Sequence, residues 1–357
     1  MLRLLSPREK SMDPVSARKI LVINAVNLGD ILVSFGWMGA LRNQFPSAQI
    51  DYLVREPYKE LFTEDRTVDS IIPVDLSGML NIFRTIRSLR KTQYDLTLVV
   101  WPASRNAILG LLTGAKMTVG YLTAYSDKAF YLDHHRVSSI GCPIAVIHEW
   151  SPELPFSMIP GRVIESIGGS LSYFRKNLEM ETSSSDMILF HLFSRMQNRS
   201  LSVTTAEELI RSVAVAYPSY ALKVIGWPQY DANRMRSIHN DHPAVQFIAG
   251  GDLMDELAII QKTKLVVCID SGVMHLSEML DKPIVAIFGP THPLLSISKK
   301  TVYSEQVSLF CSHLEQRICG NKECPLSQHC LDRINITTIQ NAIKEWIENG
   351  SLNNHNF

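Results

Sequence analysis

Residues 264–293 read KLVVCIDSGVMHLSEMLDKPIVAIFGPTHP and carry the strongest structural pattern in the sequence. The stretch opens with an apolar run that ends at Asp270, passes through a Ser-Gly pair into a helical pattern, and closes with a second apolar run. Strands that are apolar throughout are typical of parallel sheets covered on both faces. We therefore interpret this stretch as a βαβ unit, with strands at 264–270 and 283–289 joined by a helix at 273–281.

The same alternation continues outward from this unit over most of the chain. In the second half we expect further strands at 186–193, 221–226 and 245–250 and helices at 204–217, 232–240 and 253–263. In the first half we expect strands at 19–26, 49–54, 70–75, 94–101 and 117–121 and helices at 29–45, 80–92 and 104–115. Because the pattern occurs twice, it predicts an α/β fold with two doubly wound Rossmann-like domains that face a cleft.

A segment rich in proline, glycine and serine separates the two patterns, at residues 150–185, and a helix is expected within it at 161–178. The expected organisation is a flexible tail, a first domain, a linker with a connecting helix, a second domain, and a closing helix with its tail: residues 1–18, 19–160, 161–185, 186–335 and 336–357. The closing helix is predicted at 337–349 with Thr337 as its N-cap.

The amino-acid composition argues against several classes of protein. The chain has 357 residues, 46% of them hydrophobic, and a formal net charge of zero. Zero net charge argues against a nucleic-acid-binding protein that relies on bulk positive charge. No apolar run reaches the ~18 residues that a membrane span needs, and the first residues lack the apolar core of a secretory signal. We expect a soluble, cytoplasmic protein.

The turn after the strand 264–270 has the chemistry of a phosphate site. Free backbone N–H groups at a helix start suit an anion, and a glycine in the Ser271–Gly272 turn lets a ligand approach the backbone closely. The Asp270 carboxylate can accept hydrogen bonds from a sugar hydroxyl, and His275 lies in the first helical turn. The Gly289–Thr291 loop follows the next strand and reaches the same sheet edge. The alternative is a capped turn without function.

A second candidate follows the first strand, where Gly29 and Asp30 open a helix. A carboxylate held there could take a proton from an acceptor hydroxyl, and the alternative is again helix capping. Neither first strand is followed by G-x-G-x-x-G, which argues against a dinucleotide-dependent oxidoreductase. No Walker-type G-x-x-x-x-G-K-[ST] is present either.

These residues resemble glycosyltransferase family 9, the heptosyltransferase-like proteins of the GT-B fold. The matching motifs, in chain order, are Leu28-Gly29-Asp30, Leu41-Arg42, Phe45-Pro46, Ile50-Asp51, Ile248-Ala249-Gly250, Asp270-Ser271-Gly272, His275-Leu276 and the run from Pro283 to Pro293. The resemblance covers roughly residues 19–335. The two end motifs are specific in combination, and each would be weak by itself.

The resemblance implies an inverting transfer of a sugar from a nucleotide diphosphate, most often heptose from ADP-heptose, onto a hydroxyl. The implied acceptor is a glycan such as lipopolysaccharide core, or in some branches another molecule. Asp30 matches the family's general base, and Asp270 matches the carboxylate that contacts the donor sugar. Ser271, Gly272 and His275 match the diphosphate-binding turn. The resemblance also implies that catalysis needs no cofactor and no metal ion.

The sequence departs from the family in two places. The family has a Lys followed by Trp-Pro after the first strand of the second domain, whereas here Arg199 stands at the Lys position without Trp-Pro. Arg still binds phosphate but is not equivalent to Lys. Ser194 matches a hydroxyl that contacts the diphosphate. The family also has a Glu near the end of the next strand, for which Gln229 or Asp231 would substitute. Both changes leave the donor identity open.

Four cysteines lie close together near the end of the second domain, in the pattern C-x7-C-x4-C-x5-C: Cys311, Cys319, Cys324 and Cys330. Four thiolates around Zn²⁺ would stabilise a loop of low apolar content. The pattern lacks a C-x-x-C pair, so free thiols or partial disulfides are the other interpretation.

On the acceptor side, Arg84, Arg87 and Lys91 share one face of the expected helix 80–92 and could bind a phosphorylated or acidic acceptor. A solvated helix face is the alternative. Peripheral association with a membrane is a further expectation if the acceptor is lipid-linked. Three rival functions stay open: a nucleotide-sugar-binding protein with a degenerate site, a nucleotide-sugar epimerase or hydrolase on the same fold, and a metal-dependent module centred on the cysteines.

Overall fold

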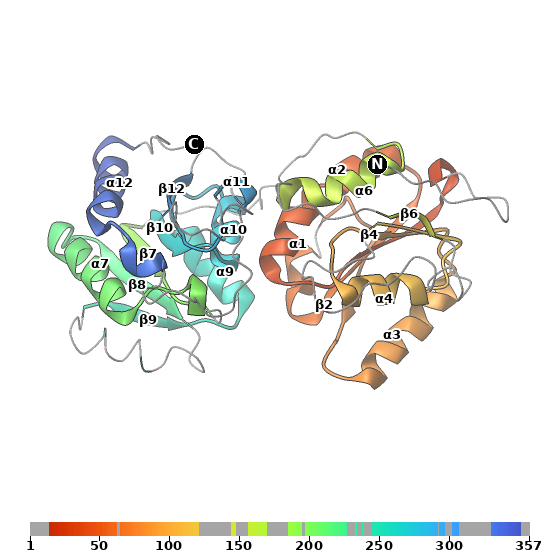
Figure 1. The fold of residues 1–357 in the computed structure, drawn as a ribbon, viewed down its shortest axis with the longest axis horizontal. Helices are drawn as coiled ribbons and strands as arrows, with labels where there is room; N and C mark the ends of the chain where they lie inside the picture. The colour runs from red at the N-terminus through yellow and green to blue at the C-terminus, as the bar shows by residue number, and fades with distance from the viewer. Residues whose placement is uncertain are drawn as a thin grey trace. The chain divides into compact units, whose positions relative to one another are not determined.

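The structure, a computed structural model, describes residues 14–62, 65–120, 144–147, 156–169, 185–194, 197–226, 233, 238, 244–291, 293–296, 302–306 and 330–350. The chain divides into two compact units, residues 1–176 and 177–357 (Figure 1). Each unit is built on its own six-stranded sheet.

The sheet of the first unit has the order β3-β2-β1-β4-β5-β6, and all its neighbouring strands are parallel. Its strands are β1 (Lys19–Asn24), β2 (Gln49–Arg55), β3 (Ser70–Val74), β4 (Leu96–Val99), β5 (Met117–Gly120) and β6 (Ile144–Ile147). The chain reverses its direction of winding between β1 and β4. Ligands of open parallel sheets bind beyond the carboxyl ends of the strands at such a switch point.

The sheet of the second unit has the order β12-β11-β10-β7-β8-β9 and is also parallel throughout. Its strands are β7 (Met187–His191), β8 (Ala221–Gly226), β9 (Gln246–Ala249), β10 (Leu265–Ile269), β11 (Ile284–Phe288) and β12 (Val302–Gln306). Counted from β7, this order repeats that of the first sheet, so its switch point lies between β7 and β10. The predicted pair of doubly wound parallel sheets is confirmed.

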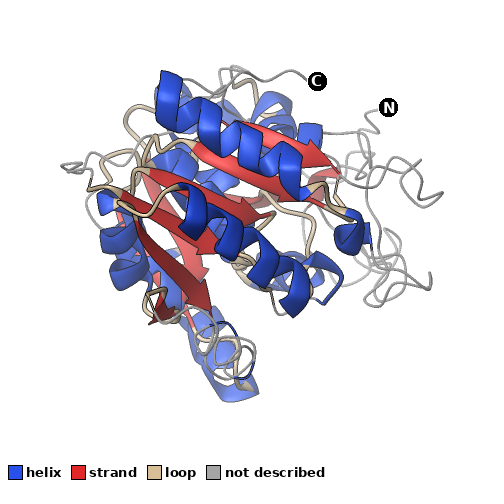
Figure 2. Cartoon of the chain, turned by 90° about the vertical axis from the view of Figure 1, so that its left-hand side faces the viewer, coloured by secondary structure: helices blue, strands red, loops and turns tan. Residues whose placement is uncertain are grey.

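Helices connect the strands and cover the sheets (Figure 2). The first unit has α1 (Leu28–Phe35), α2 (Met38–Gln44), α3 (Met79–Thr92), α4 (Ser104–Leu112) and α6 (Ile159–Ser166), with short 3-10 turns η1 (Pro14–Ser16), η2 (Glu56–Phe62) and η3 (Phe156–Met158). The second has α7 (Val203–Ala216), α9 (Leu253–Lys262), α10 (Gly272–Met279), α11 (Pro293–Ser296) and α12 (Ile336–Asn349), with η4 (Gln197–Arg199) and η6 (Cys330–Arg333). Apolar side chains of α7 and α12 share one core with the strands of the second sheet.

The helix predicted at 29–45 is two helices, α1 and α2, separated at Gly36 and Trp37. The Trp37 side chain is completely buried, and its Nε1 donates a hydrogen bond to the carbonyl oxygen of Ser157 at 2.5 Å. Its ring packs so closely on Gly161 of α6 that a Cβ at that position would lie 2.5 Å from ring carbons. The break between α1 and α2 therefore places the Trp37 indole between these two helices and α6.

Two other predicted boundaries are wrong. The helix expected at 161–178 begins at Ile159 and ends at Ser166, and Gly168 follows with a positive φ of 87°. A glycine in this conformation is the usual end of a helix. The N-cap of α12 is Asn335, whose side chain accepts a hydrogen bond from the Thr337 N–H at 3.1 Å, so Thr337 is not the cap. Strands β6 and β12 were not predicted.

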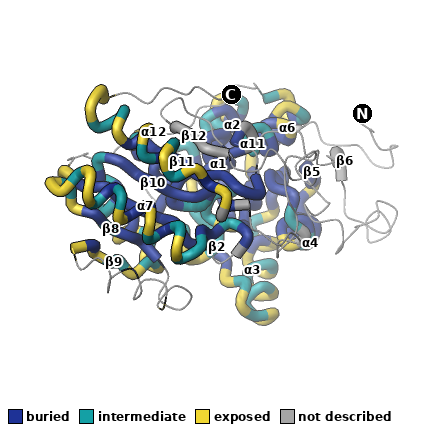
Figure 3. The backbone as a smooth tube through the Cα atoms, turned by 60° about the vertical axis from the view of Figure 1, so that its left-hand side comes forward, coloured by how far each residue is buried: buried dark blue, intermediate teal, exposed yellow. Residues whose placement is uncertain are grey.

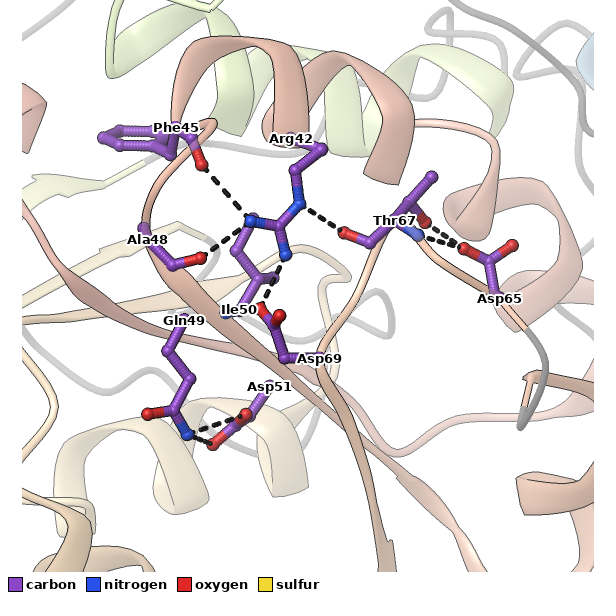
Figure 4. A network of polar contacts seen from close by, with 9 residues as sticks. All are labelled: Arg42, Phe45, Ala48, Gln49, Ile50, Asp51, Asp65, Thr67 and Asp69. Atoms are coloured by element: carbon purple, nitrogen blue, oxygen red, sulfur yellow. Dashed lines mark hydrogen bonds and ion pairs between the residues drawn. The ribbon is translucent and has the colours of Figure 1, made fainter.

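The Arg42 side chain at the end of α2 holds three segments of the first unit together (Figure 4). Its guanidinium donates to the carbonyl oxygens of Thr67 and Ala48, at 3.1 and 2.7 Å, and pairs with the Asp69 carboxylate at 2.6 Å. Asp69 also accepts a hydrogen bond from the Ile50 N–H at 2.7 Å. Arg42, a residue of one family motif, thus has a structural role in the fold.

Candidate functional site

The candidate site of the second unit is built at the switch point of its sheet. Strands β7 and β10 are direct neighbours, with Cys268 opposite His191 in register. The chain leaves β10 through Asp270 and Ser271 into α10, and it leaves β7 through the loop that holds Ser194. The topology therefore brings the two predicted donor-binding segments to the same edge of the sheet.

Asp270 and Arg199 form an ion pair at this edge. An Arg199 terminal guanidinium nitrogen lies 3.3 Å from Oδ2 of Asp270, whose side chain is only 6% exposed. The other carboxylate oxygen of Asp270, Oδ1, accepts a hydrogen bond from the Ser296 hydroxyl at 3.0 Å. Among the described residues, neither Asp270 Oδ2 nor Arg199 Nε, both buried, has a hydrogen-bond partner. The pair therefore keeps an unused hydrogen-bond acceptor on Asp270 and an unused donor on Arg199.

Ser271 is the N-cap of α10, but its side chain does not cap the helix. Its hydroxyl lies 3.1 Å from Nδ1 of His191 instead. His191 is buried at the end of β7, and burial lowers the pKa of its imidazole to about 4, so the ring is neutral at neutral pH. Without a side-chain cap, the first N–H groups of α10 can meet an anion, which the helix dipole also favours.

His275 lies in the first turn of α10 as predicted, but it faces a residue of its own helix. Its Nδ1 is 3.3 Å from a carboxylate oxygen of Glu278, which is completely buried. The His275 side chain is only 7% exposed. This contact fixes the His275 ring beside the Asp270–Gly272 turn.

The remaining predicted donor residues lie in two loops at this edge. Ser194 is half-buried, and its loop is closed by the Ser200 hydroxyl, which accepts from the Ser194 N–H and donates to the Ser194 carbonyl oxygen at 2.8 and 2.9 Å. Gly289 directly follows β11. Thr291 is completely buried, and its hydroxyl has no hydrogen-bond partner in the described part of the chain.

Asp30 occupies a corresponding place in the first unit, after β1 and next to the switch point of that sheet. The N-cap of α1 is Asn27, so Asp30 is the third residue of the helix and not its cap. The Asp30 side chain is half-buried. Its carbonyl oxygen accepts a hydrogen bond from the Ser34 hydroxyl at 2.7 Å. Asp30 is therefore not the N-cap residue, although a carboxylate in the first helical turn interacts favourably with the helix dipole.

The three cations predicted on the acceptor side, Arg84, Arg87 and Lys91, lie on α3 and are exposed. None of them forms an ion pair with another described residue. Of the cysteine cluster, Cys311, Cys319 and Cys324 lie outside the described residues, as do Gln229 and Asp231, and Cys330 opens η6. No group of three or more metal-ligating side chains occurs among the residues that the structure describes.

Sequence reasoning missed His191 and Ser296. Each contacts a predicted site residue from another segment, 80 positions from Ser271 in one case and 26 positions from Asp270 in the other. A histidine at the end of an apolar strand was a signal that could have marked His191. Ser296 follows the Gly289–Thr291 loop without any pattern of its own.

Comparisons with known proteins bear on this site. Residues 208–329, which include the Asp270 turn and the Gly289–Thr291 loop, match the family "Glycosyltransferase family 9 (heptosyltransferase)". Lipopolysaccharide heptosyltransferase 1 of Salmonella typhimurium is 22% identical over 77% of this chain and 89% of its own length. That of Campylobacter coli is 19% identical over 92% of this chain and 98% of its own. Residues 208–329 are thus similar to glycosyltransferase family 9, and most of the chain is similar to lipopolysaccharide heptosyltransferases.

The fold of the chain agrees with solved structures. A family 9 glycosyltransferase of Veillonella parvula superposes with a TM-score of 0.72 at 16% identity, covering 94% of this chain and 98% of the other. The E. coli heptosyltransferase WaaC with ADP gives a TM-score of 0.69 at 15% identity, covering 92% and 99%. The GT-B-like fold is thereby confirmed. No helix in the described part of the chain has both the length and the apolarity to cross a membrane.

Proposed function

We propose that the protein is an inverting glycosyltransferase that moves heptose from ADP-heptose onto a hydroxyl of a glycan such as lipopolysaccharide core. The observation that carries the proposal is the junction of Arg199, Asp270 and the uncapped start of α10 at the switch point of the second sheet. The family match over residues 208–329 supports the same assignment. An adenine nucleotide is further supported by the related WaaC, which was solved with ADP.

In this proposal the second unit binds the donor. The Arg199 guanidinium and the first N–H groups of α10 bear the negative charge of the diphosphate, which grows as the sugar departs. Asp270 accepts hydrogen bonds from sugar hydroxyls, and Ser296 keeps its carboxyl group in place through the 3.0 Å bond. Ser194, His275, Gly289 and Thr291 complete the donor pocket. No step requires a metal ion.

The first unit supplies the base. The acceptor hydroxyl gives its proton to the Asp30 carboxylate while its oxygen forms a bond to the anomeric carbon of heptose. The bond from that carbon to the diphosphate breaks on the opposite side, and its electron pair leaves with ADP, so the configuration inverts. Arg84, Arg87 and Lys91 would attract an acceptor that carries phosphate or carboxylate groups.

A nucleotide-sugar-binding protein with a degenerate site is the second candidate. The feature that favours it is the Arg199–Asp270 pair, in which the cation proposed for the diphosphate is engaged by the carboxylate proposed for the sugar. The family's Trp-Pro is also absent after Arg199. Measurable turnover of any nucleotide sugar would exclude this candidate.

The substitution Asp30→Asn tests the proposed reaction. It keeps the size of the side chain but removes the base, so the transfer rate should fall by about 10²–10⁴-fold. Donor affinity in calorimetric titration should stay the same, because the donor residues belong to the other unit. Glu56→Gln is a matched control, since it removes an exposed carboxylate paired only with Lys59 in the same unit. If Asp30→Asn lost donor affinity and transfer equally, the role of a base would be wrong.

A further inference from the structure

Helix α3 presents large apolar side chains to solvent. Met79, Leu80 and Phe83 are 81%, 61% and 62% exposed. Together they account for three of the six large apolar residues that the described part of the chain leaves exposed. They fall within five consecutive positions in the first turn and a half of the helix. Figure 3 shows exposed and half-buried residues along α3, whereas the neighbouring strand β2 is mainly buried.

The orientation of α3 is fixed by its other face. Leu89 is buried, and Ile82 and Ile86 pack against the same core, which includes residues of β1, β2 and β3. At 100° per residue, Leu80 lies on the opposite side of the helix from these anchors and Phe83 lies about 90° from their mean direction, whereas Met79 is exposed at the start of the helix. The exposed apolar side chains are therefore held outward by the packing of the helix.

The same outward face is cationic. The helix contains four cations and no carboxylate: Arg84, Arg87, Arg90 and Lys91. Arg90 donates to the carbonyl oxygen of Leu112 at 2.9 Å, whereas the other three have no ion pair with a described residue. Asp75, just before the helix, accepts hydrogen bonds from Ser77 and Asn81. The face thus combines an apolar tip with three cations that pair with no carboxylate in the described part of the chain.

We propose that the outward face of α3 docks on a bilayer of anionic phospholipid. Met79, Leu80 and Phe83 enter the boundary between headgroups and acyl chains, and the cations that follow contact lipid phosphates, as in other interfacial helices. If the proposed function is correct, docking holds the acceptor-binding unit at a surface that carries a lipid-linked acceptor.

Charge complementarity favours a bilayer over other occupants. A second copy of the chain using the same face would bring Arg84, Arg87 and Lys91 against the same three cations, which repel each other. The helix contains no carboxylate, so a neutral protein surface would leave its cations without a partner of opposite charge. An anionic bilayer satisfies both parts of the face at once.

Sedimentation of the full chain with vesicles tests the proposal. Vesicles of phosphatidylglycerol and phosphatidylethanolamine should bind the protein, and vesicles of phosphatidylcholine alone should bind it at least tenfold less. Leu80→Ser with Phe83→Ser should reduce binding to the anionic vesicles by more than tenfold. Arg84→Gln with Arg87→Gln should reduce it by roughly fivefold for each cation and weaken its dependence on salt.

Matched controls come from exposed residues elsewhere. Val215→Ser removes a 78% exposed apolar side chain from α7, and Lys344→Gln removes an exposed cation from α12, so neither should change vesicle binding. Binding that is equal for both vesicle types, or equal losses in the controls, would overturn the proposal. So would a dimer in light scattering that the Leu80 and Phe83 substitutions dissociate, since the face would then bind a second copy.

The test is separate from that of the proposed function. Donor affinity should be unchanged in all α3 variants, and transfer to a short water-soluble acceptor should be unchanged by the Leu80 and Phe83 substitutions. If the protein bound vesicles but had no transferase activity, membrane docking by α3 would still be supported. Only the link between docking and a lipid-linked acceptor would be lost. Transfer without any vesicle binding would overturn docking alone.

Discussion

At the scale of single residues, the Arg199–Asp270 pair is the feature with the clearest consequence. Asp270 is nearly buried, and Arg199 is the only cation that the described residues bring within ion-pair distance of it. A diphosphate that binds to Arg199 must compete with this carboxylate. Donor binding would therefore exchange one charged contact of Arg199 for another, and the carboxylate would turn to the hydroxyls of the sugar.

The substitution Arg199→Met should raise the Kd for ADP by about 10–100-fold, because a charge-assisted hydrogen bond contributes roughly 1.5–3 kcal/mol. The Kd of Arg199→Lys should lie between that of the unsubstituted protein and that of Arg199→Met, since lysine keeps the charge and lacks the planar guanidinium. Titration calorimetry measures both. Arg211→Gln, an exposed cation on α7, is the control. An unchanged Kd in Arg199→Met would mean that the arginine only neutralises Asp270.

The sequence was informative about which residues gather at this edge but not about their partners. Asp270, Ser271 and Arg199 lie together because strand ends of a parallel sheet meet at one edge, which alternation in sequence predicts. That Ser271 turns to His191 and Asp270 accepts from Ser296 depends on distances in the folded chain. Side-chain direction of this kind has no periodic signature.

At the scale of elements, the break between α1 and α2 shows the same limit. Residues 29–45 carry an uninterrupted amphipathic pattern, so a single helix was predicted. The break depends on the close contact of Trp37 with Gly161, residues that are far apart in the chain. The N-cap of α12 shows that the boundary of a helix can depend on a choice between two nearby residues. Asn335 and Thr337 both have capping side chains, and the fold selects Asn335.

The contact between Trp37 and Gly161 can be tested with two glycine substitutions. Gly161→Ala should lower the free energy of unfolding of the first unit by about 1–3 kcal/mol, since a Cβ would lie 2.5 Å from the buried indole. Gly39→Ala, within α2 and with no atom within 4 Å of the added Cβ, should raise it by about 0.5–1 kcal/mol. Denaturant titration measures both changes. Equal effects of the two substitutions would contradict the packing described for α6.

At the scale of the whole molecule, the order of strands was the most predictable property. Strand-length apolar runs alternate with amphipathic helices twice, and parallel sheets connected by short right-handed crossovers leave few topologies. The edge strands β6 and β12 were missed, because short strands at an edge carry little pattern. The residues of the motifs differ in their surroundings: Arg42 forms hydrogen bonds that stabilise the first unit, whereas Asp270 lies at the sheet edge proposed to bind the donor.

The central claim is that the second unit binds an ADP-activated heptose. Calorimetric titration of the full chain with ADP-heptose, beside ADP-glucose, GDP-mannose and UDP-glucose, tests it most directly. We predict that ADP-heptose binds most tightly, and that Arg199 suffices in place of the family's Lys. Tighter binding of a guanine or uracil sugar nucleotide would contradict the donor assignment. Failure of a folded protein to bind any of the four would contradict the site itself.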